Sequence, residues 1–199
     1  AYEIRLSLVG SEMCIRDRDL IDFHKELVGK TDAELAKMVI PKGVLGKQLK
    51  GLTYREKDGK FVKMDGKWNA RYFILYYSAS WCGPCRASLP RNLEVYRDKI
   101  APRKDLEVVL CSMDHALEGA QKWAVSNKMP WPVFLFGYLD NLSKESPLIR
   151  KNYPGPIPSL VLVDANGNKI ASGSMDGLVR KVEELASAEK EKEATAESE

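Results

Sequence analysis

The sequence predicts an α/β domain in which helices flank a central mixed β-sheet. A continuous apolar run at 72–77 and two largely apolar runs at 107–111 and 159–163 have the composition of buried strands. Amphipathic stretches with helical spacing lie between and after these runs. Strands that alternate with helices form βαβ units, and a terminal hairpin adds antiparallel pairing, so the sheet should be mixed.

The residue pattern before the first buried run predicts two short helices and a hairpin. Apolar residues recur at helical spacing over 20–27, and a capping box, TDAE, opens a second helix over 33–39. Strands at 52–55 and 60–63 then flank Asp58-Gly59, a dipeptide typical of tight hairpin turns.

Helices are also predicted after the first and second buried runs and near the C-terminal end. Their apolar positions are Leu89, Leu93, Tyr96 and Ile100, then Leu117, Ala120, Trp123 and Ala124, and finally Leu178, Val179, Val182, Leu185 and Ala186. A turn over 164–168 joins the third run to a last strand over 169–172. The stretch 189–199 has no apolar face, so we expect a disordered charged tail.

The chain is therefore predicted to consist of an N-terminal segment 1–18, a helical extension 19–50, the domain 52–188 and the tail. Residues 11–18, SEMCIRDR, resemble a translated sequencing adapter, so we leave 1–18, including Cys14, out of the fold prediction. Because the native N-terminus is then expected to be missing, both a cytoplasmic and a periplasmic or secreted location stay open.

The composition fits a soluble protein with one well-developed core. The 199 residues are 44% hydrophobic and 30% charged, which allows one domain with short extensions. No apolar run approaches the roughly 20 residues needed to cross a bilayer. The net charge of +3 comes without a dense Lys/Arg stripe, so we expect no nucleic-acid partner.

The chemistry is predicted by the pentapeptide 81–85, Trp-Cys-Gly-Pro-Cys, which lies between the first buried strand and a helix. Two thiols separated by two residues can close into a disulfide and open again. A Cys at the first turn of a helix meets unpaired N–H groups and the positive end of the helix dipole. Such surroundings lower a thiol pKa from about 8.5 into a range of roughly 3.5–7.5. The motif therefore predicts redox chemistry at Cys82 and Cys85.

Three features together resemble the thioredoxin superfamily over 52–188. They are the pentapeptide 81–85, Pro90 inside the following helix, and Ile157-Pro158 directly before the third buried run. Within the superfamily the chain is most similar to tryparedoxin- and nucleoredoxin-like proteins, and next to the TlpA/ResA type. The segments that carry this likeness are Tyr77 to Cys82, Cys85-Arg86, Glu107 to Asp114, and Met129-Pro130-Trp131.

The resemblance implies a thioredoxin fold and a cis-proline at Pro158 that faces the active disulfide. The chain departs from tryparedoxins in reading CGPC where they usually read CPPC. It departs from thioredoxin in carrying Tyr76 where thioredoxin has a buried acid. The proton acceptor for Cys85 is therefore open: Asp114 is a candidate, and a helix-capping role for Asp114 is the alternative.

The motif and the resemblance assign a role to each site residue. Cys82 is expected to attack the substrate disulfide and Cys85 to resolve the mixed disulfide. Gly83 and Pro84 keep the loop tight, and Ile157 with Pro158 binds substrate. Two further assignments stay open at this point. Trp81 either forms an apolar contact surface or packs in the core, and Met129, Trp131 and Pro132 either line the nearby surface or pack beneath it.

The predicted function is a thiol–disulfide oxidoreductase that reduces protein or small-molecule disulfides. Alternatives are a thiol oxidase or isomerase of the same fold, a non-catalytic binding module, or a zinc site that would recruit Cys111 and His115. We expect no cofactor besides the Cys82–Cys85 disulfide. The expected partners are a disulfide substrate and an external reductase or dithiol donor, and the chain is expected to be a monomer.

Overall fold

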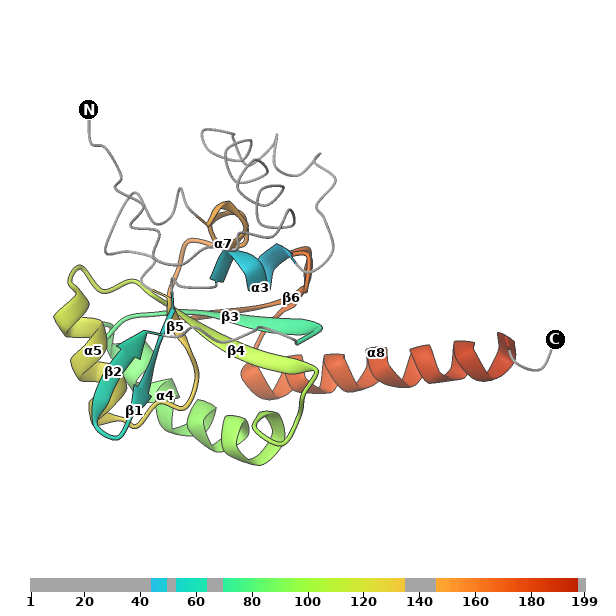
Figure 1. Ribbon diagram of the computed structural model, residues 1–199, viewed down its shortest axis with the longest axis horizontal. Helices are drawn as coiled ribbons and strands as arrows, with labels where there is room; N and C mark the ends of the chain where they lie inside the picture. The colour runs from blue at the N-terminus through green and yellow to red at the C-terminus, as the bar shows by residue number, and fades with distance from the viewer. Residues whose placement is uncertain (1–43, 50–52, 64–69, 135–145, 197–199) are drawn as a thin grey trace, which may run out of the picture.

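The computed structural model describes residues 44–49, 53–63, 70–134 and 146–196 (Figure 1). The predicted N-terminal segment 1–18 and the predicted helices at 20–27 and 33–39 lie outside these ranges.

The centre of the molecule is a mixed sheet of seven strands in the order β2-β1-β5-β4-β3-β6-β7. The strands are β1 (Thr53–Lys57), β2 (Lys60–Lys63), β3 (Tyr72–Ser78), β4 (Leu106–Ser112), β5 (Val133–Phe134), β6 (Ser159–Asp164) and β7 (Lys169–Ser172). β3 pairs in parallel with β4 and antiparallel with β6, which confirms the predicted mixed sheet.

Helices cover both faces of this sheet. They are α3 (Val44–Leu49), α4 (Gly83–Val95), α5 (Leu117–Ser126), α7 (Pro147–Lys151) and α8 (Met175–Ala196). Figure 1 shows α3 and α7 on one side of the sheet and α4 on the other. Every residue of β3 is buried, and alternate residues face opposite ways. Tyr72, Ile74 and Tyr76 join the core under α4 and α8, whereas Phe73, Leu75 and Tyr77 join the core under α3 and α7.

The predicted hairpin is confirmed. β1 and β2 pair antiparallel, and Lys57 and Lys60 are the last paired residues before the turn. Asp58 and Gly59 both have positive φ angles, of 52° and 74°, as a tight two-residue hairpin turn requires. The Gly59 N–H donates to Glu56 Oε1 at 2.7 Å, which holds the turn closed.

The structure differs from the predicted helices in the element after Cys85. α4 ends at Val95, and the chain continues as one π-helical turn, η1 (Tyr96–Ile100). The Ala101 N–H donates to the Tyr96 carbonyl five residues earlier, at 2.8 Å. Pro90 lies inside α4 without ending it.

The prediction that the chain is disordered from 189 onwards is wrong for residues 189–196. α8 continues to Ala196, because Ala, Glu and Lys are strong helix formers and the helix has already been nucleated by its packed first half. Arg71, directly before β3, donates twice to the Glu189 carboxylate, at 2.7 and 2.9 Å. The second half of α8 projects away from the sheet (Figure 1).

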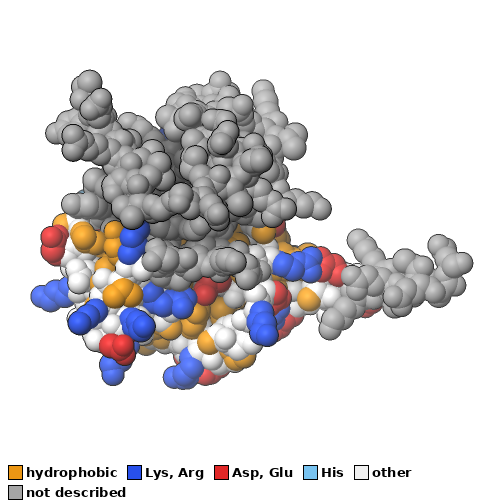
Figure 2. Space-filling model, in the orientation of Figure 1, with side chains coloured by type: hydrophobic (Ala, Val, Ile, Leu, Met, Phe, Trp, Pro, Cys, Tyr) orange, Lys and Arg blue, Asp and Glu red, His pale blue; other side chains and the backbone are white. Residues whose placement is uncertain are grey.

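The visible surface carries both signs of charge. Figure 2 shows Lys and Arg side chains interspersed with Asp and Glu, with small apolar areas between them. Across the described part of the chain, no helix has the length and apolar character needed to cross a membrane.

Candidate active site

The two cysteines of the pentapeptide lie where β3 passes into α4. Cys82 is the N-cap of α4 and Pro84 occupies its first turn, where a proline is tolerated because its missing N–H has no helical partner. Cys82 and Cys85 form a disulfide with a Cα–Cα distance of 5.2 Å. The Cys82 residue is 6% exposed and Cys85 is fully buried, so the outer sulfur is the one that a substrate can reach.

A backbone N–H of the first turn of α4 is directed at the outer sulfur. The Cys85 N–H donates to Cys82 Sγ at 3.2 Å, and the Cys82 carbonyl accepts from the Arg86 N–H at 3.1 Å. The first turn of a helix carries a partial positive charge. This arrangement stabilises negative charge on Cys82 Sγ once the disulfide opens.

The loop before β6 faces the disulfide from the other side. The Ile157–Pro158 peptide bond is cis, as the resemblance implies. The Ile157 carbonyl oxygen lies 3.9 Å from Cys82 Sγ. Ser159, the first residue of β6, donates its hydroxyl to the Pro156 carbonyl at 2.6 Å. The loop therefore presents a backbone edge next to the sulfur.

Trp81 lies on the surface beside Cys82. It is 54% exposed, which favours the contact-surface interpretation over core packing. One face of its indole stacks on the His115 imidazole, with ring centroids 5.7 Å apart and an interplanar angle of 4°. His115 is exposed as well.

Asp114 is buried between two loops. Its Oδ1 accepts hydrogen bonds from the Ser80 N–H, at 3.1 Å, and from the Ser80 hydroxyl, and its Oδ2 accepts from the Ser112 hydroxyl at 2.7 Å. The N-cap of α5 is Ala116, without a side-chain hydrogen bond, so the helix-capping interpretation of Asp114 is wrong. The carboxylate instead ties the loop after β4 to the loop that carries Cys82.

Met129, Trp131 and Pro132, which are near the site in the sequence-based prediction, pack beneath it. Met129, Trp131 and Pro132 are buried, which decides between the two interpretations in favour of packing. The Trp131 ring meets Tyr76 edge-on at 6.1 Å and Tyr96 at 5.3 Å. Tyr76, at the place of the acid in thioredoxin, is thus part of an aromatic layer under α4.

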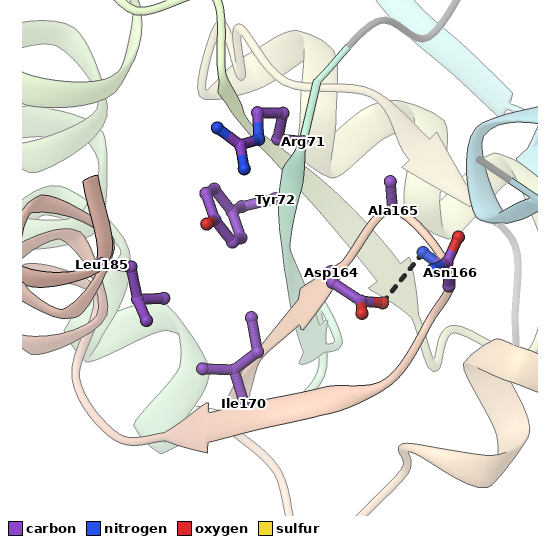
Figure 3. Close-up of a pocket in the computed structure, with 7 residues that line it drawn as sticks. All are labelled: Arg71, Tyr72, Asp164, Ala165, Asn166, Ile170 and Leu185. Carbon is purple, nitrogen blue, oxygen red and sulfur yellow. Dashed lines mark hydrogen bonds between the residues drawn. The ribbon is translucent and has the colours of Figure 1, made fainter. Parts of the chain in front are cut away.

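A hollow of about 560 Å³ lies away from the cysteine pair (Figure 3). It is lined by Arg71, Tyr72, Asp164, Ala165, Asn166, Ile170 and Leu185. Tyr72 begins β3 and the cysteines follow the end of β3, so the hollow belongs to the opposite end of the sheet. Within the described residues, no group of three or more His, Cys, Asp or Glu side chains is placed to hold a metal ion.

Sequence reasoning missed the contacts that join Ser80 to Asp114 and Trp81 to His115. Part of the signal existed, because β3 and β4 were both predicted as buried strands of a βαβ unit, in which the strands run parallel, but their register was not predicted. The carboxyl ends of parallel neighbours meet at one edge of a sheet. The structure shows this meeting directly: the Met113 N–H donates to the Ser78 carbonyl at 2.8 Å.

A family model described as Thioredoxin-like matches residues 69–169. Probable nucleoredoxin 1 of Arabidopsis thaliana is 32% identical over 123 residues, which make up 62% of this chain and 20% of that protein. Tryparedoxin of Trypanosoma brucei brucei is 36% identical over 97 residues, 49% of this chain and 63% of that protein. The chain thus spans less than two thirds of the length of these curated relatives.

Solved structures give the same result. Tryparedoxin II from C. fasciculata superposes with a TM-score of 0.54 at 28% identity, covering 72% of this chain and 91% of that one. Tryparedoxin II complexed with glutathionylspermidine superposes with a TM-score of 0.52 at 26% identity, covering 70% of this chain and 93% of that one.

Proposed function

The chain belongs to the thioredoxin-like family, and we propose that it is a thiol–disulfide oxidoreductase that reduces disulfides through Cys82 and Cys85. One observation carries the proposal: a disulfide joins the N-cap of α4 to its first turn, and the Cys85 N–H is directed at Cys82 Sγ. Tryparedoxin and nucleoredoxin relatives support it.

The proposed reaction has two exchange steps. The Cys82 thiolate attacks one sulfur of the substrate disulfide, forms a mixed disulfide, and releases the other substrate sulfur as a thiolate that takes up a proton. The Cys85 thiolate then attacks Cys82 Sγ, forms the Cys82–Cys85 disulfide and releases the second substrate thiol. Two electrons pass from the cysteine pair to the substrate. An external reductase or dithiol donor must return them.

The surroundings of the sulfur support the order of these steps. Cys82 is the more exposed cysteine, so it is the one that meets the substrate. Cys85 lies one turn into α4 and is fully buried, so it reaches only Cys82. The Ile157 backbone, 3.9 Å from Cys82 Sγ, would pair with an extended substrate segment.

The direction of electron flow is proposed from the resemblance, which associates Gly83-Pro84 between the cysteines with reducing members. The reduction potential decides it. Equilibration with mixtures of reduced and oxidised glutathione should place the pair below the glutathione poise. A potential well above that poise would favour the oxidase or isomerase alternative.

The proposed substrates are protein disulfides and small-molecule disulfides. One relative, tryparedoxin II, is complexed with glutathionylspermidine, and a small disulfide of this peptide-like kind is a reasonable substrate to test first among small molecules. We also propose that the chain acts as a monomer, which size-exclusion chromatography with light scattering would check.

The central test is reduction of insulin, with dithiothreitol as the electron source. Cys82→Ser should abolish the acceleration over dithiothreitol alone. Cys85→Ser, reduced and then freed of dithiothreitol before insulin is added, should accumulate a mixed disulfide between Cys82 and the substrate, visible by mass spectrometry. Cys111→Ala is the matched control, because it removes a thiol outside the pair. Turnover by Cys82→Ser at the wild-type rate would refute the proposal.

A further inference from the structure

The loop that carries Cys82 is held to the loop after β4 by two consecutive contacts. Ser80 donates its N–H and its hydroxyl to the Asp114 carboxylate. The next residue on each side, Trp81 and His115, stack ring on ring at 5.7 Å. The pairing therefore continues from a buried hydrogen bond outward to two exposed rings.

The outer of the two contacts restrains the side chain of Trp81, which lies largely on the surface. Trp81 is 54% exposed, and an exposed indole samples several rotamers unless a neighbour restrains it. His115 stacks against it, with the two ring planes 4° from parallel and the centroids 5.7 Å apart. The second loop is fixed by the buried carboxylate of Asp114, whose Oδ2 also accepts from Ser112.

From this geometry we propose that His115 is a positioning residue for the substrate-contacting face of Trp81. This inference rests on the proposed function, since it assumes that substrates meet Trp81 on their way to Cys82. The imidazole holds the indole in one orientation beside the sulfur, so that binding a substrate no longer has to order this side chain. The role is mechanical: it needs a flat ring at position 115, and no charge or proton.

The first test compares His115→Ala with His115→Phe in the insulin assay. We expect His115→Ala to raise KM by about three- to tenfold, the range that one aromatic contact supplies, and to leave kcat within about twofold of wild type. His115→Phe keeps a flat ring and should restore KM. Glu118→Ala, which changes an exposed residue in the first turn of α5, is the control and should behave as wild type.

A double-mutant cycle with Trp81 separates positioning from any independent effect of His115. In a Trp81→Ala background, His115→Ala should change KM by less than about twofold, because the ring that it positions is gone. The alkylation rate of Cys82 should be the same in wild type and His115→Ala, since the N-terminus of α4 is untouched. A structural collapse of the loop would change that rate.

Three results would overturn the inference: an unchanged KM in His115→Ala, a His115→Phe variant as impaired as His115→Ala, or additive effects of Trp81→Ala and His115→Ala. None of these would bear on the proposed function, which is judged separately by Cys82→Ser in the same assay. If wild type itself fails to reduce insulin and small disulfides, the proposed function fails first.

Discussion

Cys85 and Cys111 are both fully buried, yet their surroundings prepare them for different chemistry. Cys85 lies in the first turn of α4 and is bonded to Cys82, whose sulfur accepts a backbone N–H. Cys111 lies within β4, and its Sγ donates to the Val109 carbonyl at 3.8 Å. Burial raises the pKa of the Cys111 thiol well above its usual value. The pair thus offers a backbone N–H to the Cys82 sulfur, whereas the surroundings of Cys111 offer its thiol a backbone acceptor.

The contrast shows that burial alone does not make a thiol inert. A helix N-terminus presents unpaired N–H groups, whereas a central strand has already committed its own N–H groups to its neighbours. In β4, Cys111 is paired with Tyr77 of β3 and Phe134 of β5. A thiolate formed there would find no free donor among these ladder groups. The local backbone therefore gives the two sites different partners for sulfur: an N–H at Cys82 and a carbonyl at Cys111.

The largest expected effect is a difference in alkylation rate. In the reduced protein at about pH 7, iodoacetamide should modify Cys82 at least about a thousand times faster than Cys111, because only a thiolate that is accessible to solvent reacts quickly. Mass spectrometry of peptides from a time course measures both rates in one sample. Similar rates would erase the contrast between the two regions.

The next largest effect is expected at Asp114, whose carboxylate holds the loop that carries Cys82. Asp114→Ala leaves the Ser80 N–H without its acceptor and should lower the free energy of unfolding by about 2–3 kcal/mol in urea titrations. Asp114→Asn is the matched variant. It retains an oxygen for Ser80 and presents an amide to the Ser112 hydroxyl, which can accept, so we expect a loss below about 1 kcal/mol.

The same pair of variants tests Asp114 as proton acceptor for Cys85. If Asp114 acts only as an anchor, Asp114→Asn keeps insulin turnover within about threefold of wild type. If it accepts the Cys85 proton, the asparagine should stall the second exchange step, and the mixed disulfide on Cys82 should accumulate.

A smaller effect is expected from Cys111→Ala. Removing one buried sulfur from β4 should lower the free energy of unfolding by about 1 kcal/mol, through lost burial and a small cavity. Insulin turnover should stay at the wild-type level, because Cys111 lies in the packed sheet and outside the pair. A drop in turnover larger than the change in stability explains would give Cys111 a role in the reaction.

The smallest effect is a pH dependence of stability. Because burial raises the pKa of Cys111, the folded chain keeps a proton that the unfolded chain releases above about pH 8.5. The stabilisation is complete below that pH and is lost as the pH rises. From about pH 8 to about pH 9, wild type should lose about 0.7 kcal/mol relative to Cys111→Ala. Parallel pH profiles for both proteins would contradict the raised pKa.

The sequence was sufficient to predict those helices and strands that are long enough to show a hydrophobic pattern of their own. Periodicity alone predicts β3, β4 and β6 from their apolar runs, and α8 from its amphipathic face, because each is long enough to show a pattern. β5 consists of Val133 and Phe134 alone, and it exists as a strand because β4 and β1 lie on either side of it. Two residues carry no periodicity, so no sequence pattern could predict this strand.

At the site, the sequence was sufficient to predict the reactive cysteine pair. It was not sufficient to predict the contacts that hold the loop around the pair. The spacing of Cys82 and Cys85 and the position of Pro158 are local features of the chain. The contacts of Asp114 with Ser80 and of His115 with Trp81 join residues 34 positions apart. They depend on the register of β3 with β4, which pairs Ser78 with Ser112. Propensity and periodicity do not specify that register.

The ion pair between Arg71 and Glu189 lies at the end of the molecule where the protein could be attached to a surface. It joins the second half of α8 to the residue before β3, whereas Cys82 follows the end of that strand. The last turns of α8 point away from the body (Figure 1). A tether attached just beyond α8, to an electrode or a resin, would therefore hold the protein with its sulfur pair turned outward toward the solution.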